Sequence, residues 1–302
     1  MSPRRVIPPL SVTAGAKSGS DLAEYYEREY VHVDEAGFEE KIVADIKADL
    51  LFSIFPAGEK IGCFLEIGAG GGNILRRVVR KTNPARAVGM DLSFAALEKA
   101  KEQAPGVHFV CASGEKLPFK DDSFDLSLSM DVCEHVLSPD ALLREQARVS
   151  KLLLIKVPIE KNLSLPVNSA ALRLFLLARW IIRGKPMTPP FDPHVVKFSQ
   201  PAFEKLIRKA GLVTLKRTVT GTPDSPDFDE TLFRKRKELA LESGAYPARA
   251  RAIGKWFAFA RTALKKLCFA VSPALYARAF NVHLYLLCVK PDGGRRRGAP
   301  SP

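Results

Sequence analysis

Residues 64–73 read FLEIGAGGGN, and this stretch decides the fold. It joins an apolar run, an acidic residue, a glycine-rich turn and the start of a helix. Glycine tolerates positive φ and lets the backbone approach a ligand closely. A strand that leads through such a turn into a helix is typical of the nucleotide pockets of open α/β sheets. The stretch therefore predicts a nucleotide-binding α/β domain.

Short apolar runs and amphipathic runs alternate around this turn. That alternation is typical of a doubly wound, mostly parallel sheet with helices on both faces. The apolar runs predict strands over residues 61–67, 87–90, 107–111, 124–130, 152–157, 212–219 and 281–289. The amphipathic runs predict helices over residues 21–55, 73–81, 94–103, 139–149 and 201–210. Three tyrosines in the first of these are interpreted as packing against the domain, with a lid over a pocket as the alternative: Tyr25, Tyr26 and Tyr30.

The alternation predicts one domain over residues 21–291 with two interruptions. Mainly helical insertions are expected at about residues 159–193 and 221–280, where basic residues are mixed with aromatic and aliphatic ones. The tails, residues 1–20 and 292–302, are expected to be disordered because they are rich in proline and basic residues and poor in apolar ones.

The net charge of +13 is unevenly distributed. Residues 1–160 hold 20 Lys/Arg and 24 Asp/Glu, whereas residues 161–302 hold 26 and 9. An acidic half followed by a basic half indicates that the second half meets something anionic. A basic surface that is merely solvated is the alternative.

The five cysteines form no Cys-x-x-Cys pair and no metal-ligand spacing, so no metal site is expected from them. Buried, reduced thiols in the cytoplasm fit this distribution. The first residues contain no apolar segment of the kind that a secretory signal requires. A cytoplasmic location is therefore predicted.

The acidic residue of the turn, Glu66, bears on which nucleotide is bound. Dinucleotide enzymes use G-x-G-x-x-G, which Gly68 and Gly70 match, but Asn73 stands at the third glycine. A carboxylate at Glu66 would repel a pyrophosphate, whereas it suits a cationic ligand such as S-adenosylmethionine. The alternative is that Glu66 caps a backbone turn.

A second carboxylate, Asp91, follows the next strand, 23 residues beyond Gly68. A carboxylate at that place can accept hydrogen bonds from both ribose hydroxyls. Leu92 would then flank the adenine. The alternative for Asp91 is that it caps the following helix, for which Ser93 is an equally suitable residue.

Five segments, read together, resemble the class I S-adenosylmethionine-dependent methyltransferases, most closely the UbiE-like, small-molecule and quinone-type branch. They are FLEIGAGGGN (64–73), VGMDLS (88–93), ASGEKLPFKDDSFDLSLSMDVCEHV (112–136), LLREQARVSKLLLIKVP (142–158) and HVVKFSQPAFEKLIRKAGL (194–212). The resemblance covers residues 60–157 strongly and 194–219 moderately. It implies a seven-stranded sheet of order 3-2-1-4-5-7-6, with the seventh strand antiparallel.

The resemblance also implies which residues hold S-adenosylmethionine, whose product is S-adenosylhomocysteine. The methionine part would contact Glu66, Gly68 and Gly70. The ribose would contact Asp91, the adenine Leu92, and the reactive centre Met130. In one position the chain departs from the family: Ser113 stands where an aspartate commonly bonds the adenine amino group, and Ser113 would accept that bond more weakly.

Methyl transfer is an in-line displacement in which positioning lowers the barrier, and a hydroxyl acceptor also needs a base. The candidates for a base are Asp131 and His135, after the fourth strand, and His194, after the first insertion. For His135, structural hydrogen bonding at a helix start is an equal alternative.

The sequence thus predicts a methyltransferase for a small-molecule acceptor, with lipid-linked and quinone-like molecules among the candidates. Two rivals stay open: a methyltransferase-like protein that binds without catalysis, and a nicotinamide-dependent oxidoreductase. Residues 170–183 and 249–269 place basic side chains beside an aromatic-aliphatic face, as helices on anionic membranes do. A peripheral contact at the inner membrane face is therefore predicted, with an active-site cap or a dimer contact as the alternative. No nucleic acid is expected, because no recognition module is found.

Overall fold

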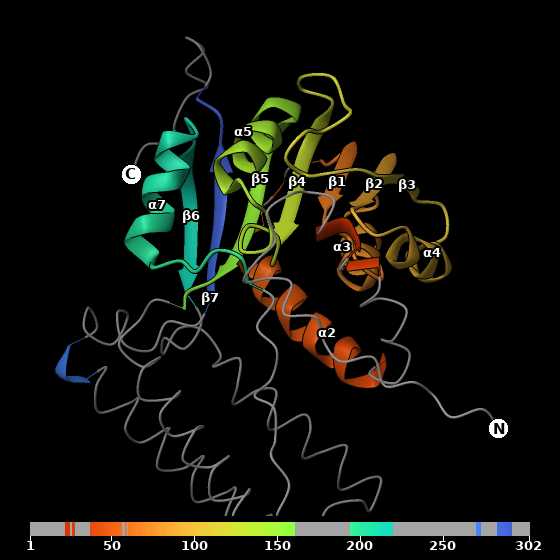
Figure 1. Ribbon diagram of the computed structural model, residues 1–302, viewed down its shortest axis with the longest axis horizontal. Coiled ribbons are helices and arrows are strands. Elements are labelled where there is room, and N and C mark those ends of the chain that lie inside the picture. The colour runs from red at the N-terminus through yellow and green to blue at the C-terminus, as the bar shows by residue number, and fades with distance from the viewer. Residues whose placement is uncertain are drawn as a thin grey trace, which may run out of the picture.

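The computed structural model describes residues 22–24, 26–27, 37–55, 58, 60–160, 194–219, 270–272 and 283–291. These residues build one seven-stranded sheet with helices packed against it (Figure 1). The predicted tails lie outside the described residues, as does nearly all of both predicted insertions, including the two segments predicted to contact a membrane. The domain limits and the membrane contact therefore stay predictions from sequence.

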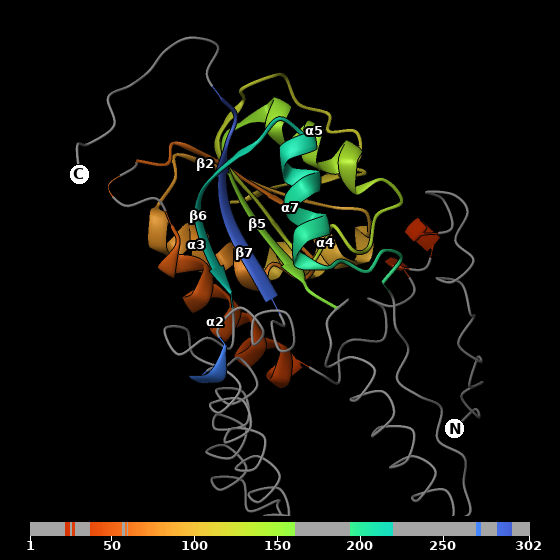
Figure 2. The same ribbon diagram turned by 90° about the vertical axis from the view of Figure 1, so that its left-hand side faces the viewer.

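The sheet has the predicted topology. Its strands are β1 (Cys63–Ile67), β2 (Arg86–Asp91), β3 (His108–Cys111), β4 (Phe124–Met130), β5 (Ser150–Pro158), β6 (Val213–Val219) and β7 (His283–Val289). They are ordered β3-β2-β1-β4-β5-β7-β6. Strands β1 to β5 pair in parallel, whereas β7 runs antiparallel to both β5 and β6 and lies between them (Figure 2). The predicted order and the antiparallel seventh strand are both confirmed.

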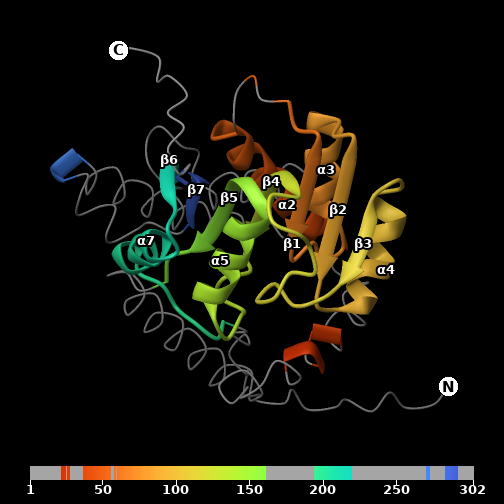
Figure 3. The same ribbon diagram turned by 90° about the horizontal axis from the view of Figure 1, so that it is seen from above.

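Helices cover both faces of this sheet, as a doubly wound fold requires. They are α2 (Gly37–Ser53), α3 (Asn73–Thr82), α4 (Phe94–Gln103), α5 (Pro139–Val149) and α7 (Gln200–Lys209). The neighbours α5 and α7 lie side by side on one face (Figure 3). In the part of the chain that the structure describes, no helix is both long and apolar enough to cross a membrane.

Two buried clusters hold the layers together. One joins α5 and α7 to the sheet, and its helical side chains are Leu142, Leu143, Ala147, Phe203 and Ile207. The other joins α2 and α3 to the opposite face through Ile46, Leu50, Leu51, Leu75 and Val78. Successive strand residues alternate between the clusters, because side chains of a strand point to opposite faces in turn.

Side-chain caps fix where two helices begin. The Ser93 hydroxyl accepts a hydrogen bond from Ala96 N at 3.1 Å, and the Ser138 hydroxyl accepts one from Ala141 N at 3.3 Å. Serine is favoured at this position because it satisfies a backbone donor that has no partner inside the helix. Both α4 and α5 therefore have the predicted limits.

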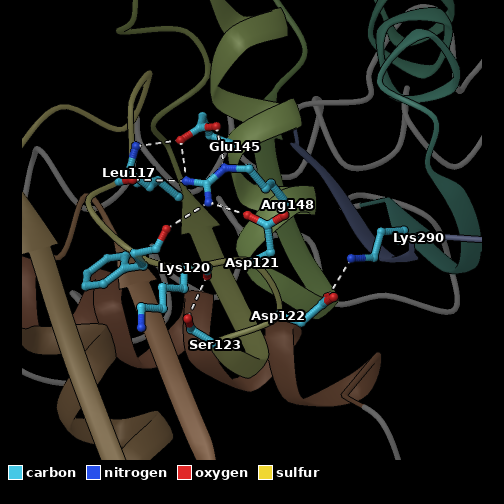
Figure 4. Close-up of polar contacts among 9 residues, drawn as sticks. Leu117, Lys120, Asp121, Asp122, Ser123, Glu145, Arg148 and Lys290 are labelled. Carbon is cyan, nitrogen blue, oxygen red and sulfur yellow. Dashed lines mark hydrogen bonds and ion pairs between the residues drawn. The ribbon is translucent and has the colours of Figure 1, made fainter.

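Arg148, in the last turn of α5, fastens the loop between β3 and β4 (Figure 4). Its guanidinium donates to Leu117 O at 3.0 Å, Phe119 O at 2.8 Å and the Asp121 carboxylate at 2.8 Å. Glu145 orients it, because each Glu145 oxygen accepts from the guanidinium at 2.8 Å. The position of the loop therefore depends on one side chain, that of Arg148. The hydrogen bonds between Arg148 and Glu145 also lower the pKa of Glu145.

Substitution of Arg148 by alanine should destabilise the fold. Two partly buried carbonyls and the carboxylates of Asp121 and Glu145 lose a charged donor, which corresponds to about 2–4 kcal/mol of the free energy of unfolding. Arg144 on the same helix is the matched control, since its exposed pair with Asp140 predicts a loss within about 0.5 kcal/mol for Arg144→Ala. Urea denaturation measures both. Equal losses for the two variants would show that the Arg148 contacts carry no special weight.

Candidate functional site

The glycine-rich turn after β1 is bound to the end of β2. Gly68 N and Ala69 N donate to Met90 O at 2.7 and 2.9 Å, and Gly70 N donates to Asp91 Oδ2 at 2.8 Å. The protein itself therefore engages three successive amide groups of the turn. In dinucleotide folds, by contrast, the pyrophosphate sits on the amide groups at the start of the helix that follows.

Gly68 cannot be replaced without strain. Its φ is +72°, and a Cβ atom built there would lie 2.4 Å from Val132 Cγ2 in the turn after β4. Glycine permits both the left-handed backbone and the close approach. The glycine turn and the turn after β4 thus lie against each other at the carboxyl edge of the sheet, where open α/β folds bind ligands.

Glu66, near the end of β1, is a buried carboxylate. Its side chain is 2% exposed, and burial, together with the charge of Asp91, raises its pKa well above the ordinary value. No hydrogen-bond donor of the described residues reaches Oε2. A buried oxygen without a donor is costly, so this position fits a ligand that brings positive charge or an N–H group.

Asp91 cross-links two elements at the same edge. Besides Gly70 N, its carboxylate accepts a hydrogen bond from Ser93 N at 3.0 Å. Burial raises the pKa of Asp91, while these backbone hydrogen bonds oppose the rise. The cap of α4 is Ser93 and not Asp91, so the helix-capping alternative for Asp91 does not apply. Each carboxylate oxygen keeps a second lone pair, which a ribose hydroxyl can use.

The segment before α2 crosses this edge of the sheet. Glu27 accepts hydrogen bonds from Ser93 Oγ at 2.9 Å and Ala95 N at 3.1 Å, at the start of α4. The neighbouring Tyr26 packs edge-on against His135, with 5.8 Å between the ring centroids. Tyr26 thus packs against the domain, as the sequence favoured, whereas Tyr25 and Tyr30 lie outside the described residues.

The remaining predicted cofactor residues line the same edge. Met130 ends β4 and is buried, and Leu92 follows β2 directly. The Ser113 hydroxyl accepts a hydrogen bond from Glu115 N at 3.2 Å, so its oxygen already has one partner. That contact limits, but does not remove, its capacity to accept from an adenine amino group.

Asp131, the first residue after β4, has a positive φ of 56° and is held by two lysines. Lys47 of α2 lies 2.5 Å from Oδ2, and Lys156 of β5 contacts Oδ1. The ammonium groups lower the pKa of Asp131 well below its usual range although burial opposes them. A carboxylate stabilised in its charged form is a weak base, so these contacts favour a structural role for Asp131.

His135 and His194, which lie 59 residues apart in the sequence, meet in the structure. Their ring centroids are 4.9 Å apart. His194 Nδ1 lies 2.9 Å from the Oε2 atom of Glu160, close enough for an ion pair when the ring is protonated. Beside them, Glu134 is 1% exposed, and burial, reinforced by the charge of Asp131, raises its pKa to about 8.

Four residues of this region did not emerge from the sequence: Lys47, Glu134, Lys156 and Glu160. Lys156 sits within the apolar run LLLIKVP, which gives no sign that a buried charge is paired there. Glu134 precedes His135 and carried the one available signal, an acidic residue beside a candidate base.

Comparison with known proteins agrees with this geometry. The family model for a methyltransferase domain matches residues 65–152, which run from within β1 through β4 to the start of β5. This segment is similar to a methyltransferase domain. It contains Glu66, Asp91 and the turn after β4, whereas Glu160 and His194 lie beyond the matched segment.

Two similar proteins are named as O-methyltransferases. A malonyl-[acyl-carrier protein] O-methyltransferase of Marinomonas sp. is 31% identical over 133 residues, which is 43% of this chain and 47% of that protein. A ubiquinone biosynthesis O-methyltransferase of Parvibaculum lavamentivorans is 35% identical over 88 residues, which is 28% of this chain and 34% of that protein. Each match thus spans less than half of the relative's length.

A solved structure shares the fold of the methyltransferase domain. Phosphoethanolamine N-methyltransferase 2 of Haemonchus contortus, in complex with S-adenosyl-L-methionine, superposes with a TM-score of 0.53 at 19% identity. The superposition covers 82% of this chain and 52% of that chain. At this identity the likeness supports the fold and nothing finer.

Replacing Lys156 by methionine should destabilise the fold. The Lys156 side chain is 1% exposed, and its loss leaves Asp131 with Lys47 alone, which we expect to lower the free energy of unfolding by about 2–4 kcal/mol. Lys151 on the same strand is the control, because its pair with Asp125 is largely exposed and Lys151→Met should change stability by less than about 1 kcal/mol. Denaturant unfolding compares the two. A Lys156→Met variant as stable as wild type would contradict the structural role of the pair.

Proposed function

We propose that the chain is an S-adenosylmethionine-dependent methyltransferase that acts on a small-molecule acceptor. The observation that carries this proposal is the Glu66 carboxylate, buried beside the glycine turn with an Oε2 atom that no donor of the described residues reaches. A cationic amino-acid ligand satisfies such a group, and a pyrophosphate does not.

The residues present fit this cofactor. Glu66 would accept from the ammonium group of its methionine part, and the turn at Gly68 and Gly70 would lie along that part. Asp91 would accept from the ribose hydroxyls, and Leu92 would pack on the adenine beside Ser113. When bound, S-adenosylmethionine supplies a methyl group on a positively charged sulfur, and S-adenosylhomocysteine is what leaves.

The nicotinamide alternative loses support on the same grounds. Three successive amides of the turn donate to Met90 O and to Asp91, and a buried carboxylate stands where a pyrophosphate would add negative charge. The non-catalytic alternative is separated from ours by turnover and not by binding.

The turn after β4 and the segment before α7 supply the candidates for acceptor chemistry. His194, whose Nδ1 atom lies 2.9 Å from Glu160, is the best-oriented base, because a carboxylate beside one ring nitrogen fixes the ring and stabilises its protonated form. His135 packs against it and against Tyr26, which suits a role in shaping the acceptor side. Asp131, held by two lysines, would position the turn.

The acceptor class follows from the named relatives only as a proposal. One of them acts, by its name, on a malonyl group carried by acyl-carrier protein, and another belongs to ubiquinone biosynthesis. Both names are of O-methyltransferases, so we propose a hydroxyl or carboxyl oxygen on a lipid-linked or quinone-like acceptor.

Glu66→Gln should weaken the binding of S-adenosylmethionine and of S-adenosylhomocysteine by about 10- to 100-fold, because a hydrogen bond to a charged group contributes about 1.5–3 kcal/mol. The matched control is Glu98→Gln on the exposed face of α4, which should bind as wild type does. Titration calorimetry measures both ligands, with NAD as the comparison. Binding of NAD in preference to S-adenosylmethionine by wild-type protein would overturn the proposal.

His194→Ala should lower turnover by about 100-fold or more if His194 is the general base. His108→Ala is the control, since His108 is exposed on β3 and away from the site. The assay follows S-adenosylhomocysteine released in a cell extract, with mass spectrometry to find the methylated product. Turnover of the His194 variant within a few-fold of wild type would end this role, and cofactor binding without any product would favour the non-catalytic alternative.

A further inference from the structure

Glu134, His135 and His194 form a compact group at the carboxyl end of β4 and β5, here termed the EHH cluster. One oxygen or nitrogen atom from each of the three side chains lies within 4.8 Å of the others. Ligands about 2.1 Å from a common ion are separated by roughly 3.0–4.2 Å, depending on the angle between them. Side-chain movements of less than about 1 Å would therefore bring the three onto one ion.

The backbone holds the cluster together across a long stretch of sequence. Glu134 O accepts hydrogen bonds from Val195 N at 2.8 Å and from Val196 N at 3.0 Å. These bonds fix the residue after His194 against the residue before His135. Binding sites whose ligands are placed in advance lose less entropy when the ligand arrives.

Glu134 itself points to a missing ligand. Its side chain is 1% exposed, and neither carboxylate oxygen has a hydrogen-bond partner among the described residues. A buried carboxylate with both oxygens unpartnered is rare in folded proteins and costs stability unless something compensates it. The two imidazoles beside it are partly exposed, so an ion can reach the cluster from solvent.

A fourth residue has the position of an outer-shell partner. Glu160 Oε2 lies 2.9 Å from His194 Nδ1. The end of β5 is placed there by a hydrogen bond from Glu160 N to Phe198 O at 3.0 Å and by the bridge between Ile159 and Phe198. A carboxylate beside one ring nitrogen orients a histidine so that the other nitrogen can bind a metal.

Lys156 acts on Glu134 only through its charge, without a hydrogen bond between them. Lys47 and Lys156 both contact the Asp131 carboxylate, and neither makes a hydrogen bond to Glu134. Both ammonium groups are thus hydrogen-bonded to Asp131, and the two imidazoles of the cluster are the side chains placed to share an ion with Glu134.

From this arrangement we propose that the EHH cluster is a site for a divalent transition-metal ion, of the class that zinc and cobalt represent. Two imidazoles and one carboxylate suit such ions better than magnesium or calcium, which prefer oxygen ligands alone. Three protein ligands leave coordination positions open for water or for an oxygen of a bound molecule. The binding of the ion does not depend on the proposed methyl transfer.

Metal binding by the full-length protein tests this directly. The protein is stripped with a chelator, and Zn²⁺ is titrated by calorimetry while Co²⁺ is followed by its visible absorption. Wild-type protein should bind one ion per chain, with a cobalt spectrum free of thiolate charge-transfer bands. Glu160→Gln should weaken binding by about 10- to 100-fold, and Glu134→Gln or His194→Ala should weaken it by more.

Two controls separate the cluster from other sites. His108→Ala removes an exposed histidine, and Cys111→Ser removes an exposed thiol; both variants should bind Zn²⁺ as wild type does. Glu134→Gln is close to wild type in shape, and circular dichroism checks that it folds. Absence of stoichiometric binding to wild type, or unchanged binding in Glu134→Gln, would overturn the proposal. Loss of binding in Cys111→Ser would move the site elsewhere and overturn it equally.

Discussion

The carboxyl edge of the sheet depends on the attachment of the glycine turn to β2. Three consecutive amides, from Gly68 to Gly70, donate to the last two residues of that strand. Backbone donors near a sheet edge must find acceptors, and here the acceptors are protein groups. The turn is thereby fixed against the end of β2 by contacts within the protein.

Asp91 extends this attachment from the turn to the next helix. One carboxylate oxygen accepts from the turn and the other from Ser93 N, at the residue whose side chain caps α4. Glu27 adds a second carboxylate at the same helix start. Two acidic side chains near a helix N-terminus are stabilised by its unpaired amides, so their placement is electrostatically consistent. The position of Asp91, the candidate for binding the ribose, is thus fixed by contacts within the protein that need no ligand.

The sequence predicts the fold well because local signals and long-range order agree. The limits of α4 and α5 follow from serine caps that are visible in the sequence, and glycine punctuates the turn after β1. Strand limits are less accurate: β5 begins at Ser150 rather than Leu152, because pairing with Phe124 of β4 extends it beyond its apolar run. Hydrogen-bonded pairing is a property of neighbouring strands, and one strand's composition does not show it.

The sequence points to candidate site residues at the ends of strands, but it does not show contacts that are made across elements. Glu66 and Asp91 follow from their places at strand ends. Lys156, by contrast, interrupts an apolar run, and only the fold shows that it meets Asp131 together with Lys47 of α2. Glu160 and His194 are brought together by a single bridge between β5 and the segment before α7, which no spacing rule anticipates.

Three carboxylates along this edge, the buried Glu66 and Glu134 and the partly buried Asp131, differ in one physical respect. Asp131 has two ammonium groups, so its charge is neutralised within the protein. Glu66 has an oxygen that no described donor reaches, and Glu134 has two. A buried carboxylate without a hydrogen-bond partner either becomes neutral through a raised pKa or has its desolvation repaid by a bound cation. We therefore expect Glu66 and Glu134 to serve two separate positive ligands, the ammonium group of the proposed cofactor at Glu66 and the proposed metal ion at Glu134.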